Sequence, residues 1–442
     1  MQNLFIVTAK YMFIILLAFY VFLSYIVLRD GKKQSHKGAL SVQSLIIYTI
    51  HLCGYIIIYM NLEKDSVVIF YGAQLIYFIV FKGLFGVIYE KTYHKGLINN
   101  MCMMLAVGFI MLSRLSYEKA VKQFIIVVMA SLLALAIPWI ISRAKALVTM
   151  SYIYCFAGIA FLATVLIIGQ LSYGAKLSIE IAGFSFQPSE FVKILYVFFI
   201  ASLLNKGTRF KYVAVSAAFA GLHVIILVLS KDLGSALIFF IVYIVMIYVA
   251  TCRFFYFGAG ILAGSGAAYM AYKLFYHVQV RVQAFTDPWS VIDTGGYQVA
   301  QSLFAIGTGG LLGLGLYKGA PRTIPVVEQD FIFAAISEEF GAFFALTLLI
   351  LYINCFLCFI KISMRQTGMF YKLVGLGLAV TYAVQTILTV GGAIKFIPST
   401  GVTLPLVSYG GSSILCTVIV FGIIQGLAVH SNLLEAEHGK NE

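Results

Sequence analysis

The sequence predicts an all-α, polytopic membrane protein with about thirteen transmembrane helices. Of its 442 residues, 62% are hydrophobic and 11% are charged, which excludes an ordinary soluble protein. The apolar residues form runs close to the length of about 20 residues that a membrane-spanning helix needs. The basic residues behind the net charge of +13 lie mainly in short connectors between these runs, as the positive-inside rule predicts, so nucleic-acid binding is not expected.

The expected spans cover, in chain order, residues 5–28, 40–61, 66–89, 98–113, 123–141, 148–170, 190–204, 212–230, 233–251, 254–274, 332–360, 373–394 and 412–430. The fourth and seventh runs are shorter than the others. The first run is longer than the apolar core of a signal peptide and has no convincing small-residue cleavage site, so we expect a retained anchor.

Charge in the connectors predicts the orientation. The connector over residues 29–38 carries Lys32 and Lys33 and should be cytoplasmic, and alternation then puts Lys91 on the same side. Alternation also puts the N-terminus outside and the C-terminus inside. Four polar segments fall on the outer face, at residues 171–190, 230–234, 278–331 and 395–411. The basic residues that fall outside against the rule are Arg114, Lys119 and Lys122, and we expect them to lie along the membrane interface.

The longest polar interval precedes the eleventh run, at about residues 275–331, and we expect it to be a structured extracellular loop. Its glycine-rich part, residues 306–319, lacks the ending of a phosphate-binding P-loop and follows no strand, so it does not indicate a nucleotide site. We expect its glycines to allow tight turns and the close approach of a backbone or a ligand. No Cys, His and Asp cluster has the spacing of metal ligands, so no structural metal is predicted.

Asp330 lies where this polar interval changes into the apolar run that begins with Phe331. A carboxylate at the boundary between water and hydrocarbon is a candidate functional group, because burying it is costly. It could equally be the N-cap or first-turn anion of a helix. Glu190 and Asp232 also stand at expected helix starts, and for them capping is the favoured interpretation, with Ser189 as the cap of the helix that carries Glu190.

Further charged residues extend this picture. Glu338 follows Asp330 by eight residues, so the two share a helix face if the helix has started by Asp330. Glu339 is expected to make a hydrogen bond between helices. Lys193, Arg281 and Lys395 stand near the outer segments, where they either anchor the chain to lipid headgroups or form a positive lining for a diphosphate.

Five segments together resemble the SEDS family of shape, elongation, division and sporulation proteins, which includes FtsW, RodA and SpoVE. They are FQPSEFVKI (186–194), KDLGSALI (231–238), GGYQVAQSLFAIGTGGLLGLGL (295–316), PVVEQDFIFAAISEEFG (325–341) and PSTGVTLPLVSYGGSS (398–413). They occur in the family's order, and the resemblance covers roughly residues 98–430. The sequence departs from the family at Lys231, where proline is common, and at Glu328 and Gln329 before the aspartate.

The resemblance implies a ten-helix core over residues 98–432, three extra helices over 1–97 and a cytoplasmic tail over 433–442. It also implies a glycosyltransferase that polymerises lipid II, the undecaprenyl-diphosphate disaccharide-pentapeptide. The reaction would take place on the outer face of the bacterial cytoplasmic membrane, with a class B penicillin-binding protein as partner. The family's essential acidic residue corresponds to Asp330.

The chemistry agrees with this layout. A sugar hydroxyl is a weak nucleophile, so Asp330 would take its proton as general base, with its pKa raised by desolvation beside Phe331. The predicted substrate-binding residues are Arg281, Lys193, Lys395, Gln187, Glu190, Asp232, Gln298, Glu338 and Ser408. The sequence indicates no definite cofactor, and a divalent cation that assists the diphosphate is left open.

Two alternatives remain at this stage. A flippase or transporter of lipid-linked precursors would use the same polar cavity without bond chemistry, although the sequence lacks the internal repeat of many transporters. A non-catalytic scaffold would only position a transpeptidase.

Overall fold

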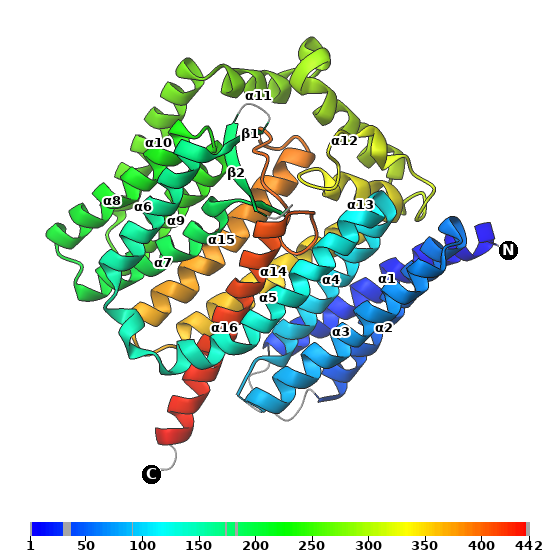
Figure 1. The fold of residues 1–442 in the computed structure, drawn as a ribbon, viewed down its shortest axis with the longest axis horizontal. Helices are drawn as coiled ribbons and strands as arrows, with labels where there is room; N and C mark the ends of the chain where they lie inside the picture. The colour runs from blue at the N-terminus through cyan, green and yellow to red at the C-terminus, as the bar shows by residue number, and fades with distance from the viewer. Residues whose placement is uncertain (1, 30–36, 91, 173–174, 182–183, 439–442) are drawn as a thin grey trace. The chain divides into compact units, whose positions relative to one another are not determined.

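The computed structural model describes residues 2–29, 37–90, 92–172, 175–181 and 184–438, and it is almost entirely helical (Figure 1). Its α-helices are α1 (Gln2–Arg29), α2 (Lys37–Leu62), α3 (Asp65–Tyr89), α4 (Lys95–Leu115), α5 (Tyr117–Arg143), α6 (Ser151–Ile168), α7 (Pro188–Lys206), α8 (Phe210–Leu229), α9 (Leu233–Thr251), α10 (Phe254–Leu274), α11 (Tyr276–Thr286), α12 (Tyr297–Gly309), α13 (Ile332–Phe340), α14 (Ala342–Met364), α15 (Met369–Ala393) and α16 (Gly411–His438). The short helical turns are η1 (Lys145–Val148), η2 (Trp289–Val291), η3 (Ile292–Gly296) and η4 (Pro321–Thr323). The expected cytoplasmic residues Lys32, Lys33 and Lys91 lie outside the described residues, as does the end of the expected tail, 439–442.

Twelve helices of the described chain are long and apolar enough to cross a membrane, and the apolar helix α6 is shorter. These helices correspond to the thirteen expected runs and confirm a polytopic helical membrane protein. The runs at 98–113 and 190–204, expected to be short, belong to helices of 21 and 19 residues.

The predicted single helix over residues 332–360 is wrong, because the chain breaks at Gly341 into α13 and α14. Gly341 has a φ of 89°, and a Cβ atom on it would lie 2.3 Å from the backbone nitrogen of Gly313. The glycine-rich segment therefore occupies the space that a continuous helix would need. Its backbone also bonds to the break, since the amides of Leu314 and Ala342 donate to the carbonyls of Glu338 and Gly310 at 3.0 and 2.9 Å.

The all-α prediction missed a small antiparallel sheet before α7. Its strands are β1 (Gln170–Ser172), β2 (Ala175–Ile181) and β3 (Phe184–Phe186), in the order β1-β2-β3. Ile179 pairs with Phe186 in its register. The sequence of β2 alternates apolar and polar residues, which is the pattern of a strand that is buried on one face.

The chain forms two compact units. Unit 1 consists of Met1–Ser131, Val280–Cys358 and Thr386–Gly410, and unit 2 of Leu132–Gln279, Phe359–Gln385 and Gly411–Glu442. In unit 1, α4 is buried along the whole of its apolar window and contacts α1, α2 and α13. In unit 2, α7 is the central helix, in contact with α6, α8, α9 and α16.

The extra helix α1 joins the rest of unit 1 through one face. Its most deeply buried residues recur every three or four positions, at Ile6, Ala9, Phe13, Leu17, Tyr20 and Ser24. The rings of Phe13 and Phe340 meet edge to face at 5.3 Å. Tyr20 and Ser24 both donate hydrogen bonds to Oδ1 of Asn100 in α4, at 3.0 and 2.9 Å.

Candidate functional site

Asp330 lies in unit 1, two residues before the start of α13. The N-cap of α13 is Phe331, whose side chain accepts no capping hydrogen bond, so Asp330 is not the helix cap. The half-buried Asp330 instead lines a small cavity that is partly open, with an empty volume of about 170 Å³ that includes the part open to solvent. Its lining residues are Asp330, Phe331, Leu388, Thr389, Gly392, Ala393, Ser399, Thr400, Gly401 and Val402.

The electrostatic environment of Asp330 suits a base. Burial raises the pKa of the Asp330 carboxyl to about 6, against the opposing effects of its own backbone amide and of Arg281, while Glu328 raises it further. Arg281, on α11, is held by a hydrogen bond of 3.3 Å from Nη1 to the carbonyl of Ser399, a residue of the cavity wall. Asp330 is thus mainly ionised at neutral pH and still basic enough to accept a proton.

Lys395 and Gln298 are placed near the same wall. Lys395 is half-buried, has a φ of 54° and follows the cavity residue Ala393 by two positions. Gln298 lies on α12 one turn before Ser302, whose hydroxyl donates to the carbonyl of Ala393 at 2.7 Å. The predicted residues Asp330, Arg281, Lys395 and Gln298 therefore all belong to elements that meet at residues 393–402.

Ser408 is buried and makes its hydrogen bonds within the protein. Its hydroxyl donates to the carbonyl of Gln329 and accepts from the amide of Leu404 at 2.9 Å. The next amide, that of Tyr409, donates to the carbonyl of Glu328 at 2.7 Å. The loop around Ser408 thus holds the two residues that precede Asp330.

The two glutamates of α13 have partners of their own. Oε1 of Glu338 accepts from the amide of Ala320 at 2.8 Å, and the buried Glu339 accepts from Nε of Arg114 at 3.0 Å. The bond to Arg114 on α4 confirms the expected link between helices. Asp330 and Glu338 do not share a helix face, because the condition for it is not met and the helix begins only at Ile332.

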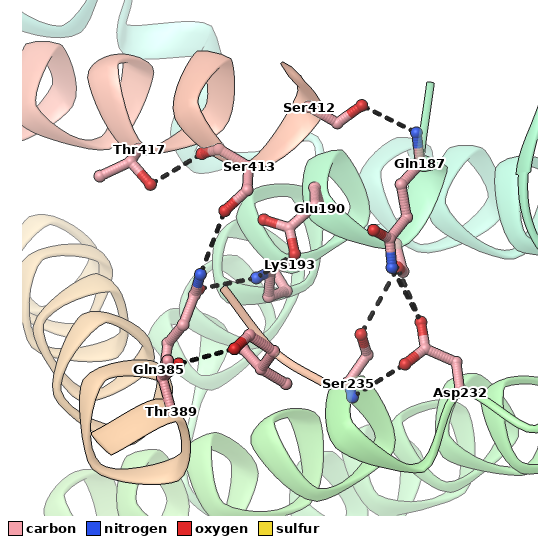
Figure 2. Close-up of polar contacts among 12 residues, drawn as sticks. Gln187, Glu190, Lys193, Asp232, Ser235, Gln385, Thr389, Ser412, Ser413 and Thr417 are labelled. Carbon is pink, nitrogen blue, oxygen red and sulfur yellow. Dashed lines mark hydrogen bonds and ion pairs between the residues drawn. The ribbon is translucent and has the colours of Figure 1, made fainter. Parts of the chain in front are cut away.

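The other predicted residues form a buried network in unit 2 (Figure 2). Nζ of Lys193 donates to Oε1 of Glu190 at 2.8 Å and to Oε1 of Gln385 at 2.9 Å, and Nε2 of Gln385 donates to Ser413 at 3.2 Å. The side chains of Lys193 and Glu190 are only 5% and 7% exposed. The charge of Lys193 is therefore balanced within the protein.

Asp232 caps α9, as predicted, by accepting from the amide of Ser235 at 3.1 Å. Its second oxygen accepts from Ser189 at 2.9 Å. The same oxygen accepts from Nε2 of Gln187 at 3.3 Å (Figure 2). The prediction that Ser189 caps α7 is wrong. The N-cap is Gln187, because Pro188 takes the first helical position, and the Ser189 hydroxyl turns to Asp232 instead.

The sequence interpretation missed the roles of Arg114, Lys119 and Gln123. Only Ser116 separates α4 from α5, so the basic residues expected along the membrane interface lie at a tight helix–helix turn. Arg114 pairs with Glu339, and Lys119 pairs with Glu328. Their conflict with the positive-inside rule was the available signal, since a charge on the unexpected side is tolerated when a carboxylate compensates it.

Among the residues that the structure describes, no group of three or more His, Cys, Asp or Glu side chains is arranged to hold a metal ion. The described cysteines are free.

Known proteins are similar to this chain in sequence and in fold. The sequence model of the FtsW, RodA and SpoVE family, described as cell cycle protein, matches residues 95–433. Peptidoglycan glycosyltransferase RodA of Mycobacterium tuberculosis is 38% identical over 299 residues, which cover 63% of this chain and 64% of that protein. The chain thus spans less than two thirds of the length of this relative. Stage V sporulation protein E of Bacillus subtilis is 30% identical, over 60% of this chain and 74% of that protein.

Solved structures agree with the fold. A chain from the structure of a peptidoglycan synthase complex that coordinates polymerization and crosslinking is 26% identical, with a TM-score of 0.67 over 77% of this chain and 98% of that one. The rod shape determining protein RodA of Thermus thermophilus has the same fold, with 24% identity and a TM-score of 0.58 over 76% of this chain and 96% of that one. The family model begins at residue 95, so the residues before it lie outside the family region.

Proposed function

The chain belongs to the FtsW, RodA and SpoVE family of cell cycle proteins, and from this we propose that it is a peptidoglycan glycosyltransferase that polymerises lipid II. The observation that carries the proposal is the Asp330 carboxyl, which faces a cavity and has its pKa raised to about 6 by burial. The relatives named peptidoglycan glycosyltransferase support it, as does the synthase complex of similar fold.

In the proposed reaction, the 4-hydroxyl of one disaccharide attacks the anomeric carbon of another. A new glycosidic C–O bond forms, and the bond from the anomeric carbon to the diphosphate oxygen breaks. Undecaprenyl diphosphate leaves with the electron pair of that bond. Asp330 takes the hydroxyl proton as general base and passes it to water.

The leaving diphosphate needs positive charge around it. We assign this role first to Arg281 and Lys395, because both belong to segments that meet beside the Asp330 cavity. Lys193 is a weaker candidate, since its charge is balanced by Glu190 at 2.8 Å. Gln298, near the same wall, is assigned to a sugar or peptide group of the substrate.

The proposal includes a location and a partner. The chain would lie in the bacterial cytoplasmic membrane, with its N-terminus outside, its C-terminus in the cytoplasm and the Asp330 cavity on the outer face. A class B penicillin-binding protein would crosslink the glycan, in keeping with the polymerization and crosslinking named for the complex of similar fold.

The test is polymerisation of lipid II by the purified chain in detergent, alone and with the co-purified partner. Wild type should make long glycan strands, and folded Asp330→Asn protein should be slower by at least about 100-fold. A flippase or a scaffold would make no glycan under these conditions. Wild-type rates from Asp330→Asn would rule out the general base.

The same assay tests for a divalent cation. If the diphosphate needs one, removing it with a chelator should abolish glycan synthesis and restoring Mg²⁺ should recover it. Full activity in chelator would show that the protein's own residues, without a divalent cation, stabilise the charge of the leaving diphosphate.

A further inference from the structure

The segment before Asp330 is held through its backbone. The carbonyls of Glu328 and Gln329 accept hydrogen bonds from the Tyr409 amide, at 2.7 Å, and from the Ser408 hydroxyl. These bonds fix the chain direction immediately before the carboxylate. The position of Asp330 therefore depends on the loop over residues 404–410.

That loop is in turn held by one side chain of α5. Nε2 of Gln123 donates to the carbonyl of Ser408 at 2.9 Å, and Oε1 of Gln123 accepts from the amide of Gly410 at 3.1 Å. Gln123 is 1% exposed, and both ends of its amide are used. A carboxylate in its place would lose the donor, and a methionine would keep the length but lose both bonds.

One helical turn earlier, on the same face of α5, Lys119 reaches the same two segments. Its ammonium group forms an ion pair with Glu328 and lies 5.6 Å from the centre of the Tyr409 ring. The pair is only partly screened from water, with the side chains of Lys119 and Glu328 38% and 13% exposed. Gly108 of α4 also packs closely against this loop, since a Cβ there would lie 2.8 Å from the carbonyl oxygen of Leu406.

We propose that Lys119 and Gln123 are positioning residues, which hold the Glu328–Asp330 segment and the 404–410 loop in the arrangement that Asp330 needs as a base. The proposal rests on the proposed function and adds to it two residues of α5 that touch neither the cavity nor Asp330. Their role is indirect. Gln123 acts through the loop, and Lys119 acts through Glu328.

The arrangement has an electrostatic consequence that mere packing would not have. The charged groups that act on Asp330 are Arg281 of α11, which lowers its pKa, and Glu328 of its own segment, which raises it. Removing the Glu328 charge should therefore lower the pKa of Asp330. Removing Lys119 takes away the cation that offsets Glu328, so it should raise the pKa of Asp330.

The experiment measures initial rates of lipid II polymerisation between about pH 5 and pH 8, a range that brackets the pKa of Asp330. The variants are Gln123→Met, Lys119→Met, Lys119→Arg and Glu328→Gln in the full chain. The matched control is Lys122→Met, also on α5, whose ion pair with Glu118 is exposed to solvent. Monodisperse elution and thermal unfolding establish that each variant folds.

Gln123→Met should lower kcat roughly ten- to a hundredfold and leave KM for lipid II nearly unchanged, because it displaces the base and not the substrate. The acidic limb of the pH profile should move to lower pH in Glu328→Gln and to higher pH in Lys119→Met. Lys119→Arg should restore the wild-type limb, and Lys122→Met should match wild type throughout.

A second readout needs no catalysis. Carbodiimide labels protonated carboxyls, so the pH midpoint of Asp330 labelling, followed by mass spectrometry, should shift in the same two directions. Unshifted midpoints, or an undiminished kcat in folded Gln123→Met, would overturn the proposal. If wild type makes no glycan while the labelling shifts occur, the proposed function fails and the positioning of Asp330 stands.

Discussion

Asp330 is half-buried, yet its carboxyl is still mainly ionised near neutral pH. Burial raises its pKa to about 6, and Arg281 limits the rise. The desolvation was predictable from the sequence, because Asp330 directly precedes Phe331. The effect of Arg281 could not be predicted from the sequence, because Arg281 lies 49 positions before Asp330 and only the fold brings the two residues together.

The wild-type pH profile follows from this pKa. A general base works as the carboxylate, so kcat/KM for lipid II should rise with pH through about 6 and level off above it. Below the pKa the rate should fall by about tenfold per pH unit. Initial rates at constant ionic strength check this, and a profile flat down to pH ~4.5 would contradict a base with this pKa.

The Arg114 and Glu339 pair makes a separate prediction about stability. Burial raises the pKa of Glu339 to about 7, and the nearby Arg114 opposes that rise. Arg114→Met leaves the buried carboxyl without its cation, which should destabilise the protein by about 3–5 kcal/mol. The double variant Arg114→Met with Glu339→Gln should recover much of the loss.

Thermal unfolding in detergent measures both variants. Lys122→Met removes the solvent-exposed pair with Glu118 and should change the midpoint little. Equal losses in Arg114→Met and Lys122→Met would show that burial does not determine the effect.

Among the elements, the glycine-rich segment acts as a fixed wall of unit 1. Four backbone hydrogen bonds of 2.8 to 3.1 Å join it to the end of α13 and the start of α14. The amides of Leu314 and Gly315 donate to carbonyls of α13, and the amides of Ala342 and Phe343 in α14 donate to carbonyls of the segment. α1 adds a hydrogen bond from Lys10 to the carbonyl of Gly313 at 3.0 Å. These contacts confirm the expectation that the glycines permit the close approach of a backbone.

Gly313→Ala should therefore lower the free energy of unfolding. Its φ is 76°, and a Cβ would lie 2.5 Å from the carbonyl oxygen of Glu339, so we expect a loss on the order of 2 kcal/mol or more. Gly307→Ala is the matched control, because that glycine lies within α12 and has open space where a Cβ would be. This substitution should raise the free energy of unfolding by up to about 1 kcal/mol. Unfolding midpoints that move in the same direction would contradict this difference.

The sequence predicted the long helices well, because the length and hydropathy of a span are local properties. It could not predict the break at Gly341, since that break depends on the backbone of Gly313 packing against it. The same reason applies at the candidate site. The motif identified Asp330, but the bonds from Lys193 to Gln385 and from Ser408 to Gln329 join residues far apart in sequence and are determined by how helices and loops pack.

At the scale of the whole molecule, the extra helices are bound to the family region by polar side chains within apolar surroundings. Asn99 of α4 donates to the carbonyl of Leu40 at 3.2 Å and to Oε1 of Gln43 at 3.0 Å, both in α2. Gln43 in turn donates to Ser24 of α1 at 2.9 Å. Nonpolar residues could not give this interface the same directional specificity.

This interface predicts that the effect of Asn99→Leu on the unfolding midpoint changes sign when the N-terminal helices are removed. In the full chain, Asn99→Leu leaves Gln43 with an unmet acceptor and should lower the unfolding midpoint. In a chain that lacks residues 1–94, Asn99 has lost both partners and would face lipid, so Asn99→Leu should raise the midpoint. Fluorescence-detected gel filtration after heating measures both, and the same sign in both backgrounds would contradict the assigned role.

The two neighbouring asparagines of α4 also bear on how the chain is made. The ribosome delivers α1 and α2 before α4, so Tyr20, Ser24 and Gln43 are already in the bilayer when Asn99 and Asn100 leave the translocon. Each bond between helices in lipid contributes about 0.6–2 kcal/mol, which favours retention of a helix that carries two amides. We therefore expect the N-terminal helices to favour the retention of α4, the first helix of the family region, in the membrane.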